Sequence, residues 1–585
     1  MKLFPKLLLV SLALFQSCSF NSNKGDEQQF RLGKGDRYYG GVFRLSEPEY
    51  IKSLYPPSII DVYSYRVASQ VYEGLFKFNQ QNITELEHGL IEKYEIDETK
   101  TVYTFHLKKG IYFHDNECFE GGKGREVTAE DIAYCFTNLC TPNRLNQNFN
   151  LFENIVKGAN EYYDTIKNGG DAPEKLEGFE VVDKYTLKIT INKPNSIFLY
   201  NLARPGSLIY PKEAYEKYGE EMRIKAVGTG PFRLSSVDEG LAINLVKNER
   251  YYGVDEFGNK LPFLEALSIQ FLKDKKVELL EFKKGNLDMM YRLPTDYIID
   301  ILDNPNAEQE FELQREPEMS TQILAMNNNK GIFSDANVRK AFSFALDKER
   351  ILDYVLNGEA YSSGKHGFTP PSFSNYDITG IEGYTFNPDS AKFYLQKAGY
   401  PNGTGFPTIT LDLNAEGERY TNVAVEVQKQ LKDYLNIEIE LNIAPIAHIT
   451  EKTLSGNFDL VRLAWVADYP SPEIFLWMFY SQNIPDDPSS KSYPNLIRYK
   501  NEEVDMYYEK ALNAFSEKEA LENFMKAEKL MMQDAPILVL WYDESYRLLQ
   551  SYIKNFPNNP MQYRDFSQVY MIPHEKKANI VAADK

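Results

Sequence analysis

The sequence predicts an α/β protein of two or three domains. Short stretches that alternate apolar and polar residues, as half-buried strands do, are mixed with longer stretches whose apolar residues recur at helical spacing. This alternation of strands and helices is clearest in the second half of the chain. At 585 residues the chain is too long to fold around one hydrophobic core, and it contains no internal repeat.

In the first half, two strands and one helix are predicted. Residues 101–107 and 185–191 alternate apolar and polar side chains, which predicts a strand in each range. A helix is predicted to begin after Thr128, because a threonine side chain can cap the free N–H groups of a first turn. Glu130 and Asp131 follow in that turn, where negative charge is favourable.

The segment Val-Gly-Thr-Gly-Pro-Phe at residues 227–232 resembles both a phosphate-binding loop and a tight turn. A phosphate loop needs converging backbone N–H groups, usually followed by Lys and Ser or Thr. Here Pro231 has no N–H, and Phe232 and Arg233 follow it. We therefore predict a turn, followed by a strand at residues 241–246.

Helices and strands alternate in the second half of the chain. Apolar residues at helical spacing predict helices at residues 335–356, 389–398 and 422–435. Strands that follow helices are predicted at residues 438–443 and 459–465. This order is typical of an α/β protein.

The first residues predict export. Residues 1–17 combine a basic start with an apolar run that is too short to cross a bilayer, as in a signal peptide. Ser17 directly before Cys18 resembles a bacterial lipobox, in which the cysteine is lipidated; the alternative is a plain secretory signal with a chance cysteine. We expect residues 18–36 to form a flexible, lipid-anchored tether. It would hold an exported protein at the bacterial cell envelope, in the periplasmic space or on the cell surface.

Composition argues against some functions and favours others. A formal net charge of −19 argues against nucleic acid as a partner. The 41 Tyr and 36 Phe residues suggest surfaces that can hold organic ligands. Beyond Cys18 the cysteines are Cys118, Cys135 and Cys140, an odd number that leaves at least one thiol unpaired within the chain. We expect Cys135 and Cys140 to be buried thiols.

Sequence motifs of catalysis and metal binding are lacking. The 84 acidic residues guarantee carboxylate pairs without indicating a glycosidase site, and the Gly-x-Ser-x-Gly pattern of serine hydrolases does not occur. Neither Cys-x-x-Cys nor His-x-x-x-His spacing occurs. We therefore expect no enzyme activity, no metal and no cofactor, and we interpret His114 as a turn residue.

Several short motifs follow one another in an order that resembles one protein family. The motifs are Tyr72-Glu73-Gly74-Leu75, Tyr103-Thr104-Phe105-His106-Leu107-Lys108-Lys109-Gly110, Phe113-His114-Asp115, Thr128-Ala129-Glu130-Asp131, residues 227–232, residues 338–347, Ala398-Gly399-Tyr400-Pro401, and Trp465-Val466-Ala467-Asp468-Tyr469-Pro470. Together they are similar to the extracellular solute-binding proteins of family 5, the oligopeptide- and dipeptide-binding receptors of ABC importers. The resemblance runs from about Gly40 to about Tyr552.

The resemblance implies a two-lobed periplasmic-binding-protein-like fold of type II, of the large cluster with an extra inserted subdomain. The hinge would lie where the chain crosses between the lobes near Ala325 and Ala535. The implied divisions are residues 37–66, 205–324 and 536–585 for lobe 1, residues 67–204 for the inserted subdomain, and residues 325–535 for lobe 2.

The resemblance also implies a ligand site at residues 465–469. In peptide-binding members the matching aspartate grips the α-amino group of the ligand, which implies that role for Asp468. Trp465 and Tyr469 would form walls of a water-poor cavity. The alternatives are that Asp468 is a turn or cap residue ahead of Pro470 and that Trp465 packs in the core. The sequence identifies no residue that would hold a peptide C-terminus.

The function implied by the family is that of a monomeric binding lipoprotein. It would capture peptides between two lobes and deliver them to the permease subunits of an ABC transporter. Asp468 favours a ligand with a cationic amine. The alternatives are a non-peptide solute in the same fold, such as an oligosaccharide, a metal chelate or haem, and a secreted hydrolase.

Overall fold

The computed structural model describes residues 30–573 except for 174, 295–296, 298–300, 302–310 and 415–417. Cys18 and the predicted signal peptide lie outside the described residues. The end of the predicted tether is folded, because β1 (Arg31–Leu32) pairs with β2 (Tyr38–Tyr39). Within the described ranges, no helix combines the length and the hydropathy that a membrane span requires.

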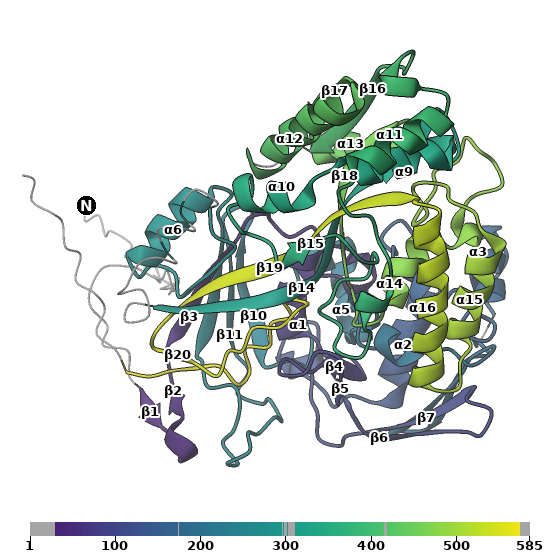
Figure 1. The fold of residues 1–585 in the computed structure, drawn as a ribbon. Helices are drawn as coiled ribbons and strands as arrows, with labels where there is room; N and C mark the ends of the chain where they lie inside the picture. Colours follow the sequence, from purple (N-terminus) through teal and green to yellow (C-terminus); the bar gives the residue numbers. More distant parts are fainter. Residues whose placement is uncertain are drawn as a thin grey trace, which may run out of the picture.

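Two four-stranded sheets are built from strands of the first half of the chain (Figure 1). In the first sheet, order β10-β11-β12-β3, β3 is parallel to β12 and the other pairs are antiparallel. The second sheet, order β6-β7-β9-β8, is antiparallel throughout. Their strands are β3 (Val42–Glu47), β6 (Ile91–Ile96), β7 (Val102–Leu107), β8 (Phe179–Asp183), β9 (Thr186–Thr190), β10 (Phe232–Asp238), β11 (Ala242–Lys247) and β12 (Ala266–Phe271).

A seven-stranded mixed sheet has the strand order β13-β19-β14-β18-β16-β17, with β15 beside β19. Its longest strands, β14 and β19, are antiparallel, and their register shifts between Pro317 and Thr321. β16 is parallel to β17 and β18. The strands are β13 (Met289–Tyr291), β14 (Phe311–Met326), β15 (Ser362–Ser363), β16 (Ile409–Asn414), β17 (Ile439–Ala444), β18 (Leu460–Val466) and β19 (Ile537–Gln550).

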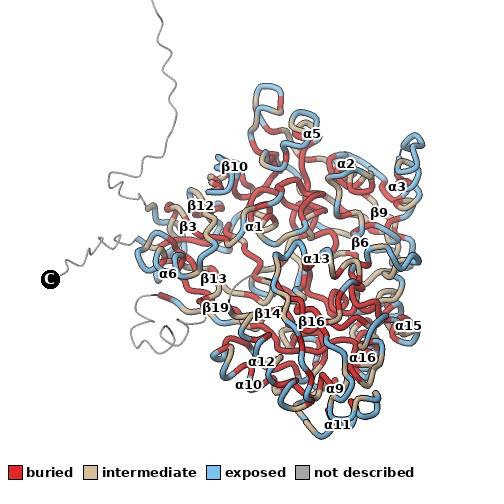
Figure 2. The backbone as a smooth tube through the Cα atoms, turned by 90° about the horizontal axis from the view of Figure 1, so that it is seen from above, coloured by how far each residue is buried: buried red, intermediate tan, exposed pale blue. Residues whose placement is uncertain are grey.

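The helices cover these sheets, and those around β16 pack a separate apolar core with it. Figure 2 shows exposed residues on outer helices such as α11, whereas β16 is mostly buried. The longer helices are α1 (Val62–Val71), α2 (Ala129–Leu139), α3 (Ala159–Lys167), α5 (Lys212–Tyr218), α6 (Lys275–Lys283), α9 (Ala336–Ala345), α10 (Lys348–Tyr354), α11 (Pro388–Lys397), α12 (Glu418–Leu435), α13 (Ile446–Leu454), α15 (Glu502–Leu512) and α16 (Glu517–Gln533).

Most of the predicted elements are confirmed, and one is wrong. α2 begins at Ala129 behind Thr128, whose side chain and that of Asp131 form a reciprocal capping box. The single helix predicted at 335–356 is two helices, because Leu346 is extended and the Asp347 side chain accepts a hydrogen bond from Arg350 N, which caps α10. The spacing of apolar residues continued across this break and concealed it. The expected free thiols are also confirmed, with Cys135 and Cys140 buried.

The Gly-Thr-Gly-Pro segment is a structural turn, as predicted. A Cβ atom on Gly228 would lie 2.2 Å from the carbonyl oxygen of Val71, at the end of α1, so only glycine fits there. His114 holds the turn, because its Nε2 lies 2.9 Å from Gly230 O and its Nδ1 accepts from Gly228 N at 3.4 Å. Burial lowers the pKa of His114 to about 4, which keeps the ring neutral and able to make both bonds near pH 7.

The turn gives a test of this packing. Gly228→Ala should lower the free energy of unfolding by about 1–3 kcal/mol, because backbone atoms must shift to admit the methyl group. Urea denaturation of the folded protein measures this change. Gly380→Ala is the matched control, since its added Cβ would meet only the flexible end of Lys529 at 3.7 Å. Equal destabilisation of the two variants would contradict the packing argument.

Candidate functional site

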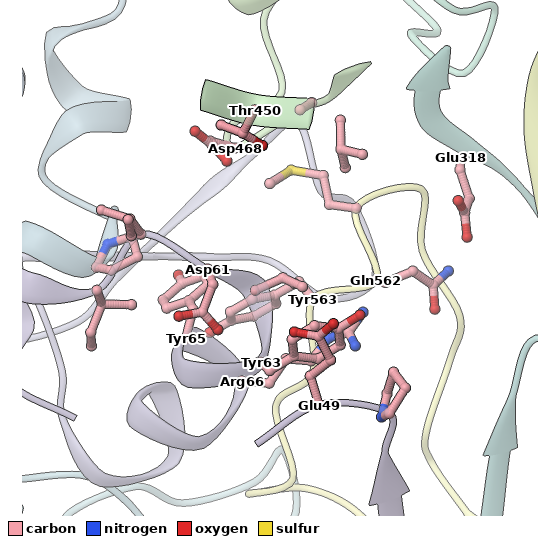
Figure 3. Close-up of a pocket in the computed structure, with 18 of the residues that line it drawn as sticks. Glu49, Asp61, Tyr63, Tyr65, Arg66, Glu318, Thr450, Asp468, Gln562 and Tyr563 are labelled. Carbon is pink, nitrogen blue, oxygen red and sulfur yellow. The ribbon is translucent and has the colours of Figure 1, made fainter. Parts of the chain in front are cut away.

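A cavity of about 2120 Å³ lies among segments that are far apart in the chain. Sites for single small molecules are commonly roughly 300–1,000 Å³, so this cavity has room for a larger ligand. Figure 3 shows a close-up of the side chains around it. The walls come from α1, the segment that ends at Pro205, residues 291–294, α12, α13, residues 466–468 and residues 560–564.

Asp468 lies on the wall of this cavity, at the loop that follows β18. Its Oδ2 lies 3.0 Å from Nη2 of Arg204, which approaches from the segment before Pro205. The Asp468 side chain is 61% exposed, whereas that of Arg204 is 11% exposed. The carboxylate is therefore solvated and shared with an arginine, and it does not lie in the water-poor surroundings that the sequence suggested.

Trp465 and Tyr469 are not among the described residues that line the cavity. Successive side chains on a strand point to opposite faces, and Val466 lines the cavity, so Trp465 points away from it. Its indole Nε1 donates to Ile474 O at 2.7 Å. This bond places Trp465 behind the loop that carries Asp468.

Tyr469 also supports the loop. It is buried, its hydroxyl donates to the Glu473 carboxylate, and its ring stacks on Tyr200 with centroids 6.1 Å apart. Tyr508 donates to the same carboxylate, and burial raises the pKa of Glu473. The guanidinium of Arg204 lies 5.0 Å from the centre of the Tyr469 ring. Tyr469 therefore holds Arg204 in place beside Asp468.

A second group of charges lines the cavity and was missed by the sequence reasoning. The guanidinium groups of Arg66, Arg564 and Arg292 lie 5.4, 5.6 and 5.6 Å from the centre of the Tyr291 ring. We call these three residues the arginine group; all of them line the cavity. They are so far apart in the sequence that no local motif connects them. Only the folded chain brings them together.

Two buried glutamates pair with the arginine group. Glu47 accepts from Arg66 Nη1 at 3.0 Å and also from Arg564 Nη1. Burial opposes its ionisation, yet Arg564 and Arg66 hold the pKa of Glu47 below its usual value. Glu318 accepts from Arg292 Nη2 at 2.7 Å, while burial raises its pKa. The site thus holds an acidic group at Asp468 and a basic group around Tyr291, an arrangement suited to a ligand that carries both charges.

Metal binding finds no support in the described ranges, where no cluster of three or more His, Cys, Asp or Glu side chains is arranged to hold an ion. His114, which the sequence analysis interpreted as a turn residue, is not itself in a turn; it is buried and bonded to the separate turn at residues 227–232.

The chain matches a known family and known structures along most of its length. The family model described as "Bacterial extracellular solute-binding proteins, family 5 Middle" matches residues 85–486. Heme-binding protein A of Haemophilus influenzae is 27% identical over 87% of this chain and 89% of its own. The dipeptide-binding protein of Escherichia coli is 24% identical over 85% of this chain and 88% of its own.

Two solved structures are similar in fold. The periplasmic binding protein DppA from Helicobacter pylori, in complex with the peptide STSA, has a TM-score of 0.75 and 23% identity over 92% of this chain and 98% of its own. A periplasmic oligopeptide-binding protein from Borrelia burgdorferi has a TM-score of 0.75 and 25% identity over 91% of this chain and all of its own. The predicted α/β, two-lobed periplasmic-binding-protein-like fold is confirmed by these likenesses.

Proposed function

This chain belongs to the bacterial extracellular solute-binding proteins of family 5, and we propose that it captures peptides between two lobes and delivers them to the permease of an ABC importer. The observation that carries the proposal is the large cavity with Asp468 on its wall. Support comes from the similar proteins: two are named as dipeptide- or oligopeptide-binding proteins, and one was solved in complex with a peptide. Members of the family are binding proteins, and we propose that this one releases its ligand unchanged.

Asp468 would receive the α-ammonium group of the peptide. A carboxylate offers about four acceptor positions, so Arg204 and an ammonium group can share it. When the lobes close on a ligand, water leaves the cavity and the charge-assisted hydrogen bond strengthens. The supporting contacts of Trp465 and Tyr469 would keep the Asp468 loop in position for this bond.

Replacement of the carboxylate tests this role. Asp468→Asn keeps the shape of the side chain and removes its charge, so a desolvated ammonium group would lose its partner at a cost of about 2–5 kcal/mol. We expect peptide affinity to fall roughly 30-fold or more. Titration calorimetry with a free peptide and its N-acetylated form, on both proteins, gives the full cycle.

The acetylated peptide is the internal control, because it has no α-ammonium group and should bind the original protein poorly. Equal weakening of the two peptides by the substitution would make Asp468 structural. Arg204→Gln is the matched variant across the ion pair. This substitution should leave the Asp468 carboxylate without its arginine partner. The peptide with an α-ammonium group should then bind more tightly, whereas the affinity of the acetylated peptide should not increase. A non-peptide solute, such as the haem named for the Haemophilus relative, would be indicated if neither peptide bound.

Closure of the lobes gives a second test. A ligand that contacts both sides of the cavity binds the closed form better than the open form and so shifts the population toward it. Small-angle scattering should therefore show a smaller radius of gyration with a saturating peptide mixture than without it. Identical curves at saturation would count against closure.

We also propose that the protein is exported and that Cys18 is lipidated, so that a monomer is tethered at the cell envelope. Cys18→Ser should move the protein from the detergent-soluble membrane fraction into the soluble exported fraction, because the acyl chains would have no attachment site. Fractionation followed by immunoblotting measures the shift. Ser17→Ala is the control, since it leaves a small residue before the cysteine, and an unchanged distribution of Cys18→Ser would exclude the anchor.

A further inference from the structure

Large apolar side chains are exposed inside the cavity around Asp468. Val466 precedes Asp468 by two residues, and Figure 3 shows Asp61 across the pocket from Asp468. Single exposed apolar residues need no explanation, but several that surround one charged group mark a surface on which a ligand binds. Among the described residues, the exposed large apolar side chains that line the cavity are Ile60, Val62, Tyr354, Val466 and Tyr493.

Two tyrosine rings lie close to the ion pair of Asp468 and Arg204. Tyr493 is 60% exposed, yet the surrounding protein desolvates it enough to raise its pKa to about 12; both observations hold for a ring that projects into a cavity. Burial also raises the pKa of Tyr65, whose hydroxyl donates to Ala203 O at 3.2 Å, next to Arg204. The charges of Asp468 and Arg204 act on both tyrosines. The two rings therefore border the place where a ligand ammonium group would bind.

These rings are held in position by other aromatic side chains. The Tyr493 ring meets the Trp477 ring edge-on, with centroids 5.8 Å apart and planes at 85°. The centre of the Tyr65 ring lies 6.3 Å from that of Tyr563, and all four residues line the cavity. Aromatic contacts of this kind fix the orientation of a ring. The protein thus presents a preformed apolar surface beside Asp468.

Charged groups at this end of the cavity are already bonded within the chain. The Asp61 carboxylate caps α1, because it accepts from Ser64 N at 2.9 Å and from Ser64 Oγ at 2.8 Å. Lys491 Nζ, two residues before Tyr493, lies 2.7 Å from the Glu451 carboxylate. Neither group is free to pair with a charged side chain of a ligand. The surroundings of Asp468 therefore favour an apolar group next to the ammonium group.

We propose that Tyr65, Tyr493 and Val466 form a subsite for an aromatic side chain on the first residue of the bound peptide. This inference rests on the proposed function and specifies which peptides the protein selects. The first side chain of a peptide branches from the same carbon atom that carries the α-ammonium group. A peptide held at Asp468 therefore places that side chain against these residues. An aromatic ring gains there from burial and from ring contacts with the tyrosines.

Peptide competition tests the subsite. The protein, freed of co-purified ligand, is incubated with a pool of alanine peptides of three to five residues in which one position at a time carries Phe, Leu, Ser or Glu. Mass spectrometry measures the retained peptides. At the first position, Phe should be retained roughly 10-fold or more over Ser, with Leu between them. An equal preference for Phe at every position would contradict the subsite, because it would show only a general affinity for apolar peptides.

Variants connect the preference to the tyrosine. Tyr493→Ala removes one wall of the subsite, so the Phe/Ser ratio at the first position should fall roughly threefold or more, whereas Tyr493→Phe should retain it. Phe393→Ala is the matched control, because Phe393 on α11 is also 60% exposed and is not among the described residues that line the cavity. Circular dichroism checks that each variant is folded. The selection by the unmodified protein is decisive even if Tyr493→Ala does not fold.

The possible failures are distinguishable. If the protein retains peptides without regard to their first residue, the subsite is excluded and the proposed function stands. If it retains no peptide at all, the proposed function falls and the subsite falls with it. A preference at the first position that Tyr493→Ala leaves intact in a folded protein would also overturn the subsite.

Discussion

The pairing of β14 with β19 is the constraint on which the binding site depends. These strands of 16 and 14 residues are paired from Phe311 with Gln550 to Ala325 with Ile537. β13 pairs with β19 near one end, which fixes Tyr291 and the arginine group around it, while β18 pairs with β14 near the other, which fixes the loop that carries Asp468. Opposite sides of the cavity are thus positioned by one ladder of backbone hydrogen bonds. Its register shift between Pro317 and Thr321 is a natural place for the sheet to bend, beside the cavity residue Glu318.

Electrostatic cost distinguishes the two sides of the cavity. Asp468 and Arg204 form a pair that is partly exposed, and such pairs contribute little to stability. Glu47 and its two arginines are buried, where the desolvation of three charges offsets much of their attraction and a hydrophobic packing of equal volume is often at least as stable. The arginine group is therefore poorly explained by folding stability alone.

Local signals in the sequence predicted local structure well and the site only in part. The cap at Thr128 and the glycine turn at 228–230 depend on neighbouring residues, so the sequence alone was enough to predict them. The break at Leu346 was missed because helical spacing of apolar residues continues from α9 into α10. Asp468 was found through a motif, whereas the arginine group depends on contacts between segments hundreds of residues apart. Successive side chains of a strand point to opposite faces, so Val466 and Trp465 cannot both face the cavity. This alternation is visible in the sequence and could have shown that Trp465 lies behind the loop.

The ion pair between Arg204 and Asp468 bears on how a ligand ammonium group could bind at this side of the cavity. In the structure an arginine of the chain itself occupies the carboxylate to which the ligand ammonium group is proposed to bind. Only the Asp468 side of this pair is well exposed, because the Arg204 side chain is 11% exposed. A ligand ammonium group that shares the carboxylate leaves Arg204 paired, whereas one that displaced the arginine would leave a largely buried guanidinium group without its carboxylate. A ligand with only one of the two charges leaves one side of the cavity unmatched, and both charges together are what the geometry favours.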